Sequence, residues 1–335
     1  MVINRSNPVP QSWLGKEVLV TGGSGFVGTW LSRSLTDKGA HVTKLVRVRS
    51  QAREVICDDA GPKVAIVRGS VEDSDFVCGV LKKTRFDAVF HLASTNDNRG
   101  LVEPASDVFD ANILGAWNLL SGVQKFLSPQ CTIVLASSSE LDRLKTQKRG
   151  KIGANWTSIH PYHAAKKCTE AIGEMFFEQY GLKLASIRLP NVFGSGDHNA
   201  SRIVPSIISA LIREEAPRLN STDDVARRYV YVEDVVDALL TVAEHLSAGR
   251  AEDCRFGFLP NPALTPVTLL KVIKEEFYGE PAGSSKLLEL NGSAVKDNEW
   301  DTLSKIEEIG WKEKIGIRLG LKMTINWFQE NEPAA

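Results

Sequence analysis

The amino-acid sequence predicts an α/β protein with a doubly wound parallel sheet and a smaller, discontinuous C-terminal lobe. First, short β-branched segments alternate with segments whose apolar residues recur at helical spacing, which is typical of parallel sheets covered by helices on both faces. Second, several strand segments are almost continuously apolar, as expected where both faces of a strand are buried. Third, a glycine-rich segment joins the first predicted strand to the first predicted helix.

The predicted strands follow one another along the first part of the chain. Helical spacing is clearest in two of the segments between them, residues 26–38 and 108–126. The predicted strands are residues 17–22, 40–48, 63–69, 87–93, 131–137 and 182–190.

The alternation stops after Pro190. Residues 194–226 are rich in Gly, Ser, Asn and charge around one helix, and the sheet-like pattern returns at 227–246 and 254–259. From Pro260 onward the sequence is mostly helical with polar connections. The two expected units are a larger α/β domain, residues 12–193 plus 227–259, and a smaller substrate lobe, residues 194–226 plus 260–335.

Composition and charge indicate an ordinary globular protein. The chain has 335 residues, of which 43% are hydrophobic and 24% charged, and its formal net charge is -1, so we expect no binding of nucleic acid or of an anionic membrane. No segment approaches the roughly 18 apolar residues of a membrane span, and the N-terminus lacks the apolar core of a secretory signal. The five cysteines are scattered without a CxxC pair, so we expect a reduced, cytoplasmic protein with no disulfide framework and no zinc or other metal site.

The glycine-rich segment after the first predicted strand is TGGSGFVGTWL, residues 21–31. Its glycines, Gly22, Gly23, Gly25 and Gly28, have the spacing of the phosphate-binding turn in a Rossmann domain. Glycine is needed there because the turn is tight, the backbone approaches a pyrophosphate and the helix packs closely on the strand. The helix that follows would present its first N–H groups to the phosphates. The segment therefore predicts a dinucleotide site.

The end of the second predicted strand bears on the choice between NAD and NADP. An acidic residue about 20 residues after the glycines commonly binds the ribose of NAD. In this chain the place holds Arg47, closely followed by Arg49. An arginine there can pair with a 2′-phosphate, which would favour NADP, but a pair of surface arginines is an equally good interpretation. We expect NAD, with NADP as the alternative.

Tyr162 and Lys166 lie four residues apart in PYHAAKK, at the start of the helix before the last predicted strand. This spacing places both on one face of the helix. A phenol with a pKa of about 10 is a poor base at neutral pH, and a nearby ammonium lowers that pKa. The preceding strand ends in IVLASSSELD, residues 133–142, where three hydroxyls precede Glu140. The order of glycine-rich turn, serine, tyrosine and lysine predicts an active site at this strand end.

This order resembles the short-chain dehydrogenase/reductase superfamily, in its extended branch of NAD-dependent epimerases and dehydratases. The resemblance extends over nearly the whole chain and implies a nicotinamide cofactor and a sugar-nucleotide substrate. The segments that carry it are HLAS (91–94), NILGAWNLL (112–120), RLPNVFG (188–194), RRYVYVEDVVDAL (227–239) and LSKIEEIGW (303–311). Two further segments resemble CDP-glucose 4,6-dehydratases, SWLGKEVLVTGGSGFVGTWL (12–31) and NVFGSGDHNASRIVPSII (191–208).

The resemblance implies a reaction that begins at C4 of the sugar. In this family the C4 hydroxyl gives its proton to a tyrosinate while the C4 hydride passes to the nicotinamide. Tyr162 would be that base, and Ser138 would hydrogen-bond the reacting oxygen. Lys166 would lower the pKa of Tyr162 and hold the nicotinamide ribose. A dehydratase then removes the C5 proton with a glutamate and expels the 6-hydroxyl, whereas an epimerase returns the hydride to C4 with inversion.

The residues after Ser138 leave the choice between these reactions open. Glu140 stands where 4,6-dehydratases carry the glutamate that takes the C5 proton. Ser139 stands where they carry the acid that protonates the leaving hydroxyl, and a serine cannot donate a proton as a carboxylic acid does. We expect a 4,6-dehydratase of the CDP-glucose type. The alternatives are an NDP-sugar 4-epimerase and a catalytically silent NAD(P)-binding regulatory protein.

The resemblance also implies the remaining binding residues and the oligomeric state. We expect a homodimer formed by the helices of residues 112–126 and 162–180, with apolar contacts from Trp117, Phe176 and Phe177. The cofactor-binding residues would be Gly22, Gly25, Phe26, Val27, Gly28, Arg47, Ser70, Val71, Leu92, Ala93, Asn112, Tyr162 and Lys166. The substrate-binding residues would be Ser94, Asn191, Arg202 and Arg227.

Overall fold

The structure is a computed structural model that describes residues 13–47, 64–95, 105–141, 160–219, 225–249, 253–259, 263–279 and 303–331. Its strands are β1 (Glu17–Thr21), β2 (His41–Val46), β3 (Val64–Arg68), β4 (Ala88–His91), β5 (Thr132–Ser138), β6 (Lys183–Leu189), β7 (Asn191–Phe193), β8 (Arg227–Tyr231), β9 (Arg255–Gly257), β10 (Ala263–Leu264) and β11 (Ser304–Lys305). Its helices are α1 (Phe26–Asp37), α2 (Ser74–Lys83), α3 (Ala105–Phe109), the π-helix η1 (Asp110–Leu114), α4 (Gly115–Phe126), α6 (Pro161–Tyr180), α7 (Ile203–Ile212), α8 (Val232–Ser247), α9 (Pro266–Tyr278) and α10 (Ile317–Asn331).

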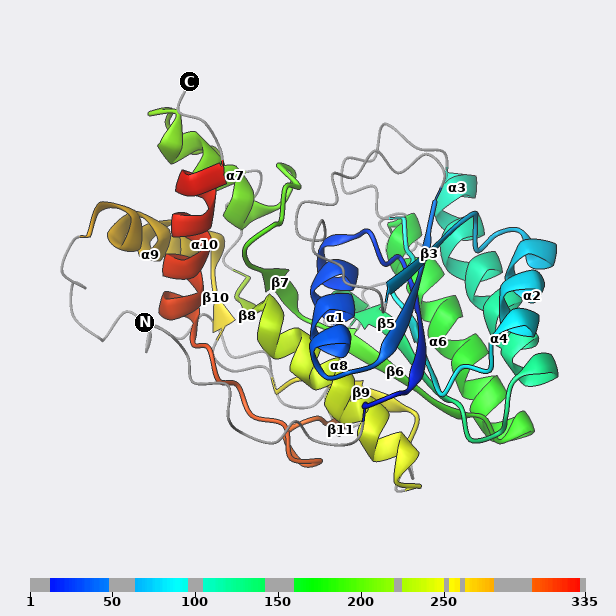
Figure 1. Ribbon diagram of the computed structural model, residues 1–335. Coiled ribbons are helices and arrows are strands. Elements are labelled where there is room, and N and C mark those ends of the chain that lie inside the picture. Colours follow the sequence, from blue (N-terminus) through cyan, green and yellow to red (C-terminus); the bar gives the residue numbers. More distant parts are fainter. Residues whose placement is uncertain are drawn as a thin grey trace, which may run out of the picture.

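The larger sheet has eight strands in the order β11-β9-β6-β5-β4-β1-β2-β3. Every neighbouring pair in it is parallel. Helices cover both faces, with α1 and α8 on one side and α2, α4 and α6 on the other (Figure 1). The chain therefore has the doubly wound α/β fold that its alternating strands and helices predict.

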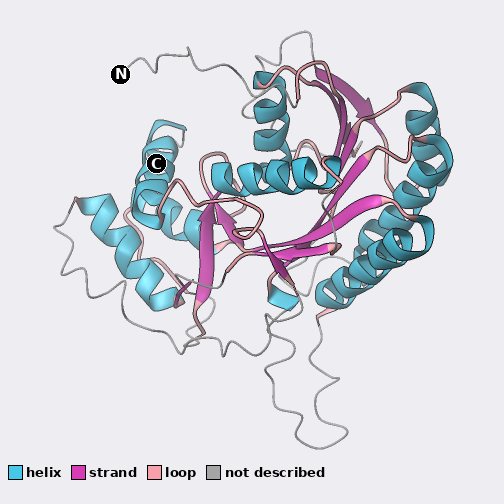
Figure 2. Cartoon of the chain, turned by 90° about the horizontal axis from the view of Figure 1, so that it is seen from below, coloured by secondary structure: helices cyan, strands magenta, loops and turns pink. Residues whose placement is uncertain are grey.

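Alternate residues of the central strands face opposite helix layers, because successive side chains of a strand point to opposite faces. In β1, Val18 and Val20 pack with α1 and α8, whereas Leu19 packs with α2 and α4. In β5, Val134 belongs to the first of these clusters and Ile133 to the second. Figure 2 shows the strands lying between the helical layers. Burial on both faces explains why these segments are apolar without interruption.

A smaller mixed sheet lies beside the larger one, with the order β10-β8-β7. β7 and β8 are parallel, β10 and β8 are antiparallel, and helices α7, α9 and α10 pack with this sheet in a core of their own. The structure thus places β8 in the smaller sheet, although residues 227–259 were expected with the larger domain, and it places β11 in the larger sheet. The expected division of the chain into two units stays a prediction.

The chain returns to the larger sheet before α10. β11 pairs with β9, and the indole of Trp311 is buried and donates to the carbonyl oxygen of Asp234 at 3.0 Å. The carboxylate of Asp234 accepts hydrogen bonds from the backbone of Lys314 at 3.0 Å and of Ile315 at 2.7 Å. These contacts join the start of α8 to the segment that leads into α10.

Candidate active site

The glycine-rich turn lies at the carboxyl end of β1, near the middle of the larger sheet. Gly22 has a φ of +68°, and a Cβ there would lie 2.8 Å from the backbone of both Leu92 and Ala93. A Cβ at Gly28 would overlap the carbonyl oxygen of Gly22. Gly25 is the N-cap of α1, and no side chain caps this helix. The turn therefore offers close backbone and unused first-turn N–H groups, which is what a pyrophosphate requires.

Further residues predicted to bind the cofactor follow β2 and β3 at the same edge of the sheet. Arg47 comes directly after β2 and is exposed. Val71 is buried, and its carbonyl accepts a hydrogen bond from the amide of Asn118 at 3.1 Å. The hydroxyl of Ser70 accepts a backbone hydrogen bond within its own turn at 3.2 Å. Arg49 lies outside the described residues. Arg47 is therefore the described arginine at this strand end that could pair with the 2′-phosphate of NADP.

The structure brings Ser138, Tyr162 and Lys166 together at the carboxyl end of β5. Ser138 is the last residue of β5, and the other two lie in the first turns of α6. The phenol of Tyr162 is hydrogen-bonded to Ser138 and also to Ser94, which follows β4. The ammonium of Lys166 donates to the carbonyl oxygen of Ala136 at 2.9 Å and lies 5.9 Å from the centre of the Tyr162 ring. The hydroxyl of Ser138 therefore interacts with the phenol, and the amine of Lys166 lies beside the phenol ring.

Burial opposes the charged forms of Tyr162 and Lys166. It raises the pKa of Tyr162, and the hydrogen bond to Ser138 and the positive charge of Arg202 counter this most. Burial lowers the pKa of Lys166 to about 8, although the carboxylate of Glu170 works in the opposite direction. At neutral pH Lys166 is therefore still mainly an ammonium. The effect of Lys166 on the pKa of Tyr162 stays a prediction.

His91, the last residue of β4, is a neutral neighbour of this group. Burial and the positive charge of Lys166 lower the pKa of His91 to about 3. Its Nδ1 lies 2.8 Å from the hydroxyl of Thr21, and that hydroxyl also accepts from the backbone of Ala93 at 3.2 Å. The imidazole therefore joins the end of β4 to the end of β1, where the glycine-rich turn begins.

Ser139 and Glu140 continue directly from β5. The backbone N–H of Ser139 donates to the carbonyl of Leu189 at 2.9 Å, and the N–H of Glu140 donates to the Ser138 hydroxyl at 3.3 Å. One carboxylate oxygen of Glu140 lies 3.8 Å from Nε of Arg227, and its charge raises the pKa of Tyr162. The strand end thus places a carboxylate close to the tyrosine.

Arg202, at the N-cap of α7, approaches the site from the smaller lobe. Its guanidinium lies 5.7 Å from the centre of the Phe26 ring at the start of α1. It also pairs with the buried carboxylate of Asp197 at 3.0 Å and lowers the pKa of Tyr162. Arg202 therefore connects the glycine-rich turn, the tyrosine and the lobe.

Two predicted binding residues, Asn112 and Asn191, use their side chains within the protein. The amide of Asn112 donates to the carbonyls of Thr95 at 3.0 Å and of Val108 at 2.8 Å, and it accepts from Ser94 at 2.8 Å. The amide of Asn191 donates to the β8 backbone at 3.5 Å. Asn112 thereby holds the Ser94 hydroxyl beside the site, so its visible contribution is to position another residue.

Sequence reasoning missed several residues that surround the tyrosine and lysine. His91, Asp197, Glu170 and Arg188 were given no role, although Glu170 follows Lys166 by one helical turn and that spacing could have revealed it. Asp197 gave no comparable signal, because its partner Arg202 meets it through the fold of the loop before α7.

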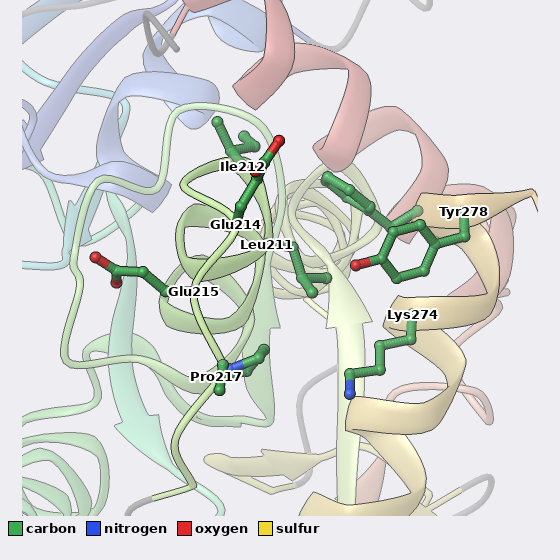
Figure 3. Close-up of a pocket in the computed structure, with 9 residues that line it drawn as sticks. Leu211, Ile212, Glu214, Glu215, Pro217, Lys274 and Tyr278 are labelled. Carbon is green, nitrogen blue, oxygen red and sulfur yellow. The ribbon is translucent and has the colours of Figure 1, made fainter. Parts of the chain in front are cut away.

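A hollow of about 600 Å³ lies elsewhere, in the smaller lobe between the end of α7 and α9. Figure 3 shows Lys274 and Tyr278 of α9 facing Leu211 of α7 across it. It is lined by Leu211, Ile212, Glu214, Glu215, Ala216, Pro217, Lys274, Phe277 and Tyr278. None of the predicted site residues lines it.

Comparison with known proteins supports the family that the sequence resembles. Residues 18–255 match the NAD dependent epimerase/dehydratase family. The chain belongs to this family. This confirms the prediction of an enzyme of the NAD-dependent sugar-nucleotide dehydratase/epimerase type.

Relatives of known activity include both dehydratases and epimerases. A UDP-glucuronate 4-epimerase of Arabidopsis thaliana is 29% identical, with 97% of this chain and 78% of that protein covered. A dTDP-D-glucose 4,6-dehydratase of Bos taurus is 27% identical, with 96% and 91% covered. A solved dTDP-glucose 4,6-dehydratase of Bacillus anthracis, in complex with NAD, has the same fold, with a TM-score of 0.73, 16% identity and 95% and 98% covered. The chain is thus similar to proteins with either activity.

The residues present fit the NAD that the family requires. Gly22 and Gly28 let the turn pack tightly at the start of α1, because a Cβ at either position would overlap neighbouring backbone, and no side chain caps the first N–H groups of that helix. Tyr162 and Lys166, in the first turns of α6, lie beside the end of β5, two strands from β1 at the same edge of the sheet, where the nicotinamide end of a dinucleotide would lie.

Proposed function

We propose that the protein is an NDP-sugar 4,6-dehydratase of the CDP-glucose type. The observation that carries the proposal is Glu140, a carboxylate at the end of β5 that acts electrostatically on Tyr162. A 4-keto intermediate acidifies the neighbouring C5–H bond, and a carboxylate beside the C4 base is suited to take that proton. The CDP-glucose assignment is supported by the segments 12–31 and 191–208.

The residues of the chain would move protons at two carbon centres. Tyr162 takes the proton of the C4 hydroxyl while Ser138 holds that oxygen through a hydrogen bond. Bound nicotinamide supplies the acceptor and later the donor of the hydride. Glu140 then takes the C5 proton, and the bond between C6 and its hydroxyl group breaks.

Loss of the 6-hydroxyl also needs a proton, and Ser139 cannot supply it as a carboxylic acid. Among the described residues at this strand end, Glu140 is the acid that can return one, once it has been protonated by C5. We therefore propose that Glu140 carries the C5 proton to the departing 6-hydroxyl, so that water leaves.

Arg227 is proposed to bind the diphosphate of the substrate. Its Nε lies 3.8 Å from Glu140, and guanidinium pairs well with phosphate oxygens. Arg202 is proposed to bind the substrate from the lobe side, and Asn191 through its exposed edge. In the free protein the guanidinium of Arg227 lies beside the carboxylate of Glu140, so the diphosphate would compete with Glu140 for this guanidinium.

A 4-epimerase is the second candidate, because Ser139 replaces an acid that only a dehydratase needs. Incubation with CDP-, UDP-, GDP- and dTDP-hexoses in deuterated water separates the two reactions. A dehydratase yields a 4-keto product that has lost water and carries deuterium from the solvent at C5. A 4-epimer without deuterium at C5 and without water loss from any hexose nucleotide would establish the epimerase instead.

The cofactor is proposed to be NAD, with NADP as the alternative because Arg47 stands at the end of β2. A 2′-phosphate would lie within reach of an exposed guanidinium at that strand end. Comparison of NAD and NADP binding to Arg47→Ala tests this. NADP affinity that falls in this variant while NAD affinity is kept would identify an NADP enzyme.

We also propose a homodimer formed by α4 and α6. Trp117, on α4, has 47% of its surface exposed. Leu114, the last residue of the η1 helix that precedes α4, has 41% exposed. Phe176 was expected in the interface but is buried in its own subunit, with its ring 5.7 Å from that of Trp117. Phe177 is partly buried. The apolar contact would therefore come from the α4 side.

A cytoplasmic location is proposed from the cysteines. In the described part of the chain Cys78, Cys131, Cys168 and Cys254 are free thiols, and Cys57 lies outside it. Burial raises the pKa of Cys131 to about 12, which keeps this thiol unreactive. Within the same residues no helix is both long and apolar enough to cross a membrane.

A further inference from the structure

A buried carboxylate, Glu170, lies one turn beyond Lys166 on α6 and takes no part in the steps above. It accepts hydrogen bonds from Nε of Arg188 at 2.8 Å, from the second guanidinium nitrogen at 2.6 Å and from the hydroxyl of Ser137 at 2.5 Å. The side chains of Arg188 and Glu170 are only 7% and 8% exposed. Three elements, β5, α6 and β6, therefore meet at this one carboxylate.

We propose that Glu170 is a positioning residue for the reaction, which fixes α6 against the end of β5 and places a negative charge one helical turn from Lys166. The inference rests on the proposed role of Lys166 in turnover.

The positions of the partners place the carboxylate directly behind the site. Ser137 pairs with Arg188 across β5 and β6, and Ser138, the next residue, pairs with Leu189. Glu170 thus holds the strand one residue before the hydroxyl that bonds Tyr162. Because hydrogen bonds to charged groups are stronger than neutral ones, this contact fixes the helix and the strand at a defined register.

Stability alone gives little reason for a charge at this place. Burying an ion pair costs desolvation, and apolar residues of similar volume often stabilise a fold as well or better. The charge has a clearer use toward Lys166, which is itself buried and one helical turn away.

The groups that face the ammonium of Lys166 come from three elements. Tyr162 and Glu170 approach from α6, the neutral imidazole of His91 from β4, and the carbonyl of Ala136 from β5. Of these four, Glu170 supplies the negative charge. A carboxylate favours the ammonium over the free amine and so raises the pKa of Lys166, against the effect of burial. Removal of that charge must therefore move the titration of Lys166 to lower pH.

The test is Glu170→Gln in the full-length protein, with Lys166 followed by NMR of isotopically labelled lysine during a pH titration. We expect the midpoint of Lys166 to fall by about one pH unit, a tenfold loss of proton affinity. The limb of the kcat/KM profile that reports Lys166 should move by the same amount and in the same direction, because activity requires the ammonium.

Two further variants keep the test decisive. Glu174→Gln removes another acid one turn further along α6, where the side chain is 38% exposed and 4.0 Å from Arg255, and should leave the Lys166 midpoint unchanged. If Glu170→Gln does not fold because Arg188 has lost its carboxylate partner, Glu170→Gln combined with Arg188→Met removes both buried charges. The Lys166 midpoint should then fall by less, because loss of the guanidinium acts in the opposite direction to loss of the carboxylate.

The titration needs no substrate, so it separates this inference from the proposed function. A lowered midpoint in a protein that turns over no hexose nucleotide would defeat the proposed function and leave the charge assignment standing. An unchanged Lys166 midpoint in either folded variant would overturn the inference, whatever happens to activity.

Discussion

Glu140→Gln removes the carboxylate at the end of β5 and keeps the shape of the side chain. The lost partner is Arg227, 3.8 Å away, and the two side chains are 26% and 16% exposed. At an effective dielectric constant of about 20, such a pair has a Coulomb energy of about 4 kcal/mol. Partial solvation and side-chain entropy reduce the net value of exposed pairs to about 0–1 kcal/mol. The variant should therefore fold, and its free energy of unfolding should fall by no more than about 1 kcal/mol.

The effect on turnover should be much larger than the effect on folding. Loss of a general base typically costs about 10²- to 10⁴-fold in rate, so water loss should slow by this factor. In the proposed mechanism hydride transfer from C4 depends on Tyr162 and Lys166, so reduced nicotinamide should accumulate in the protein.

Stopped-flow absorbance reports the reduced cofactor, and mass spectrometry reports the lost water and deuterium at C5. Arg227→Met is the comparison variant: it breaks the same ion pair but keeps the carboxylate, so it should weaken substrate binding and retain C5 exchange. Water loss within tenfold of the wild-type rate in Glu140→Gln, or no reduced cofactor in the first turnover, would refute the assignment of Glu140.

Four other predictions follow from the same geometry. Tyr162→Phe should abolish turnover and leave cofactor and substrate binding nearly intact by calorimetry, since the phenol mainly moves a proton; activity within tenfold of wild type would contradict this. Ser139→Asp should raise the rate of water loss by about 10²-fold or more if acid catalysis limits it, and an unchanged rate would argue for an epimerase. Gly28→Ala should destabilise the protein by about 1–3 kcal/mol in denaturant unfolding and weaken NAD binding, because the added Cβ would overlap rigid backbone. Gly79→Ala in α2 is the control: a Cβ there has open space, so this variant should be more stable by about 0.5–1 kcal/mol. Trp117→Lys should convert the proposed dimer to monomers in light scattering, and a wild-type monomer at micromolar concentration would exclude the dimer.

The larger sheet could be predicted because its strands carry their own signal. β1 and β5 are buried on both faces, so each is a continuous apolar run that stands out from the helices around it. The smaller sheet gave no such signal. β7 has three residues and follows β6 almost at once, so the sequence shows only the continuation of a strand. Its partner β8 lies far along the chain, and β10 has two residues, too few to show a pattern. The same holds for β11, the two-residue strand at the edge of the larger sheet.

The candidate site divides in the same way between local and distant information. Tyr162 and Lys166 share a helix face through their spacing, and Ser138 ends a strand, so the sequence alone places them at one sheet edge. Contacts between elements could not be predicted like this. The contact of Ser94 with Tyr162 depends on how β4 lies beside β5, and the approach of Arg202 to Phe26 depends on how the smaller lobe packs against α1.

The electrostatics of the site support our proposal of a dehydratase rather than an epimerase. In the proposed mechanism the first step, which both reactions share, requires Tyr162 in its deprotonated form. Burial and, to a smaller extent, the negative charge of Glu140 oppose that form by raising the pKa of Tyr162. Arg202 and the hydrogen bond from Ser138 act against that effect, so part of the surrounding charge offsets the carboxylate. An epimerase has no step that uses a carboxylate near C5, and a neutral residue there would make proton removal at C4 easier. A dehydratase must take a second proton, from C5, and for that step the carboxylate is needed. The presence of Glu140 close to the tyrosine is therefore a disadvantage for one reaction and a requirement of the other.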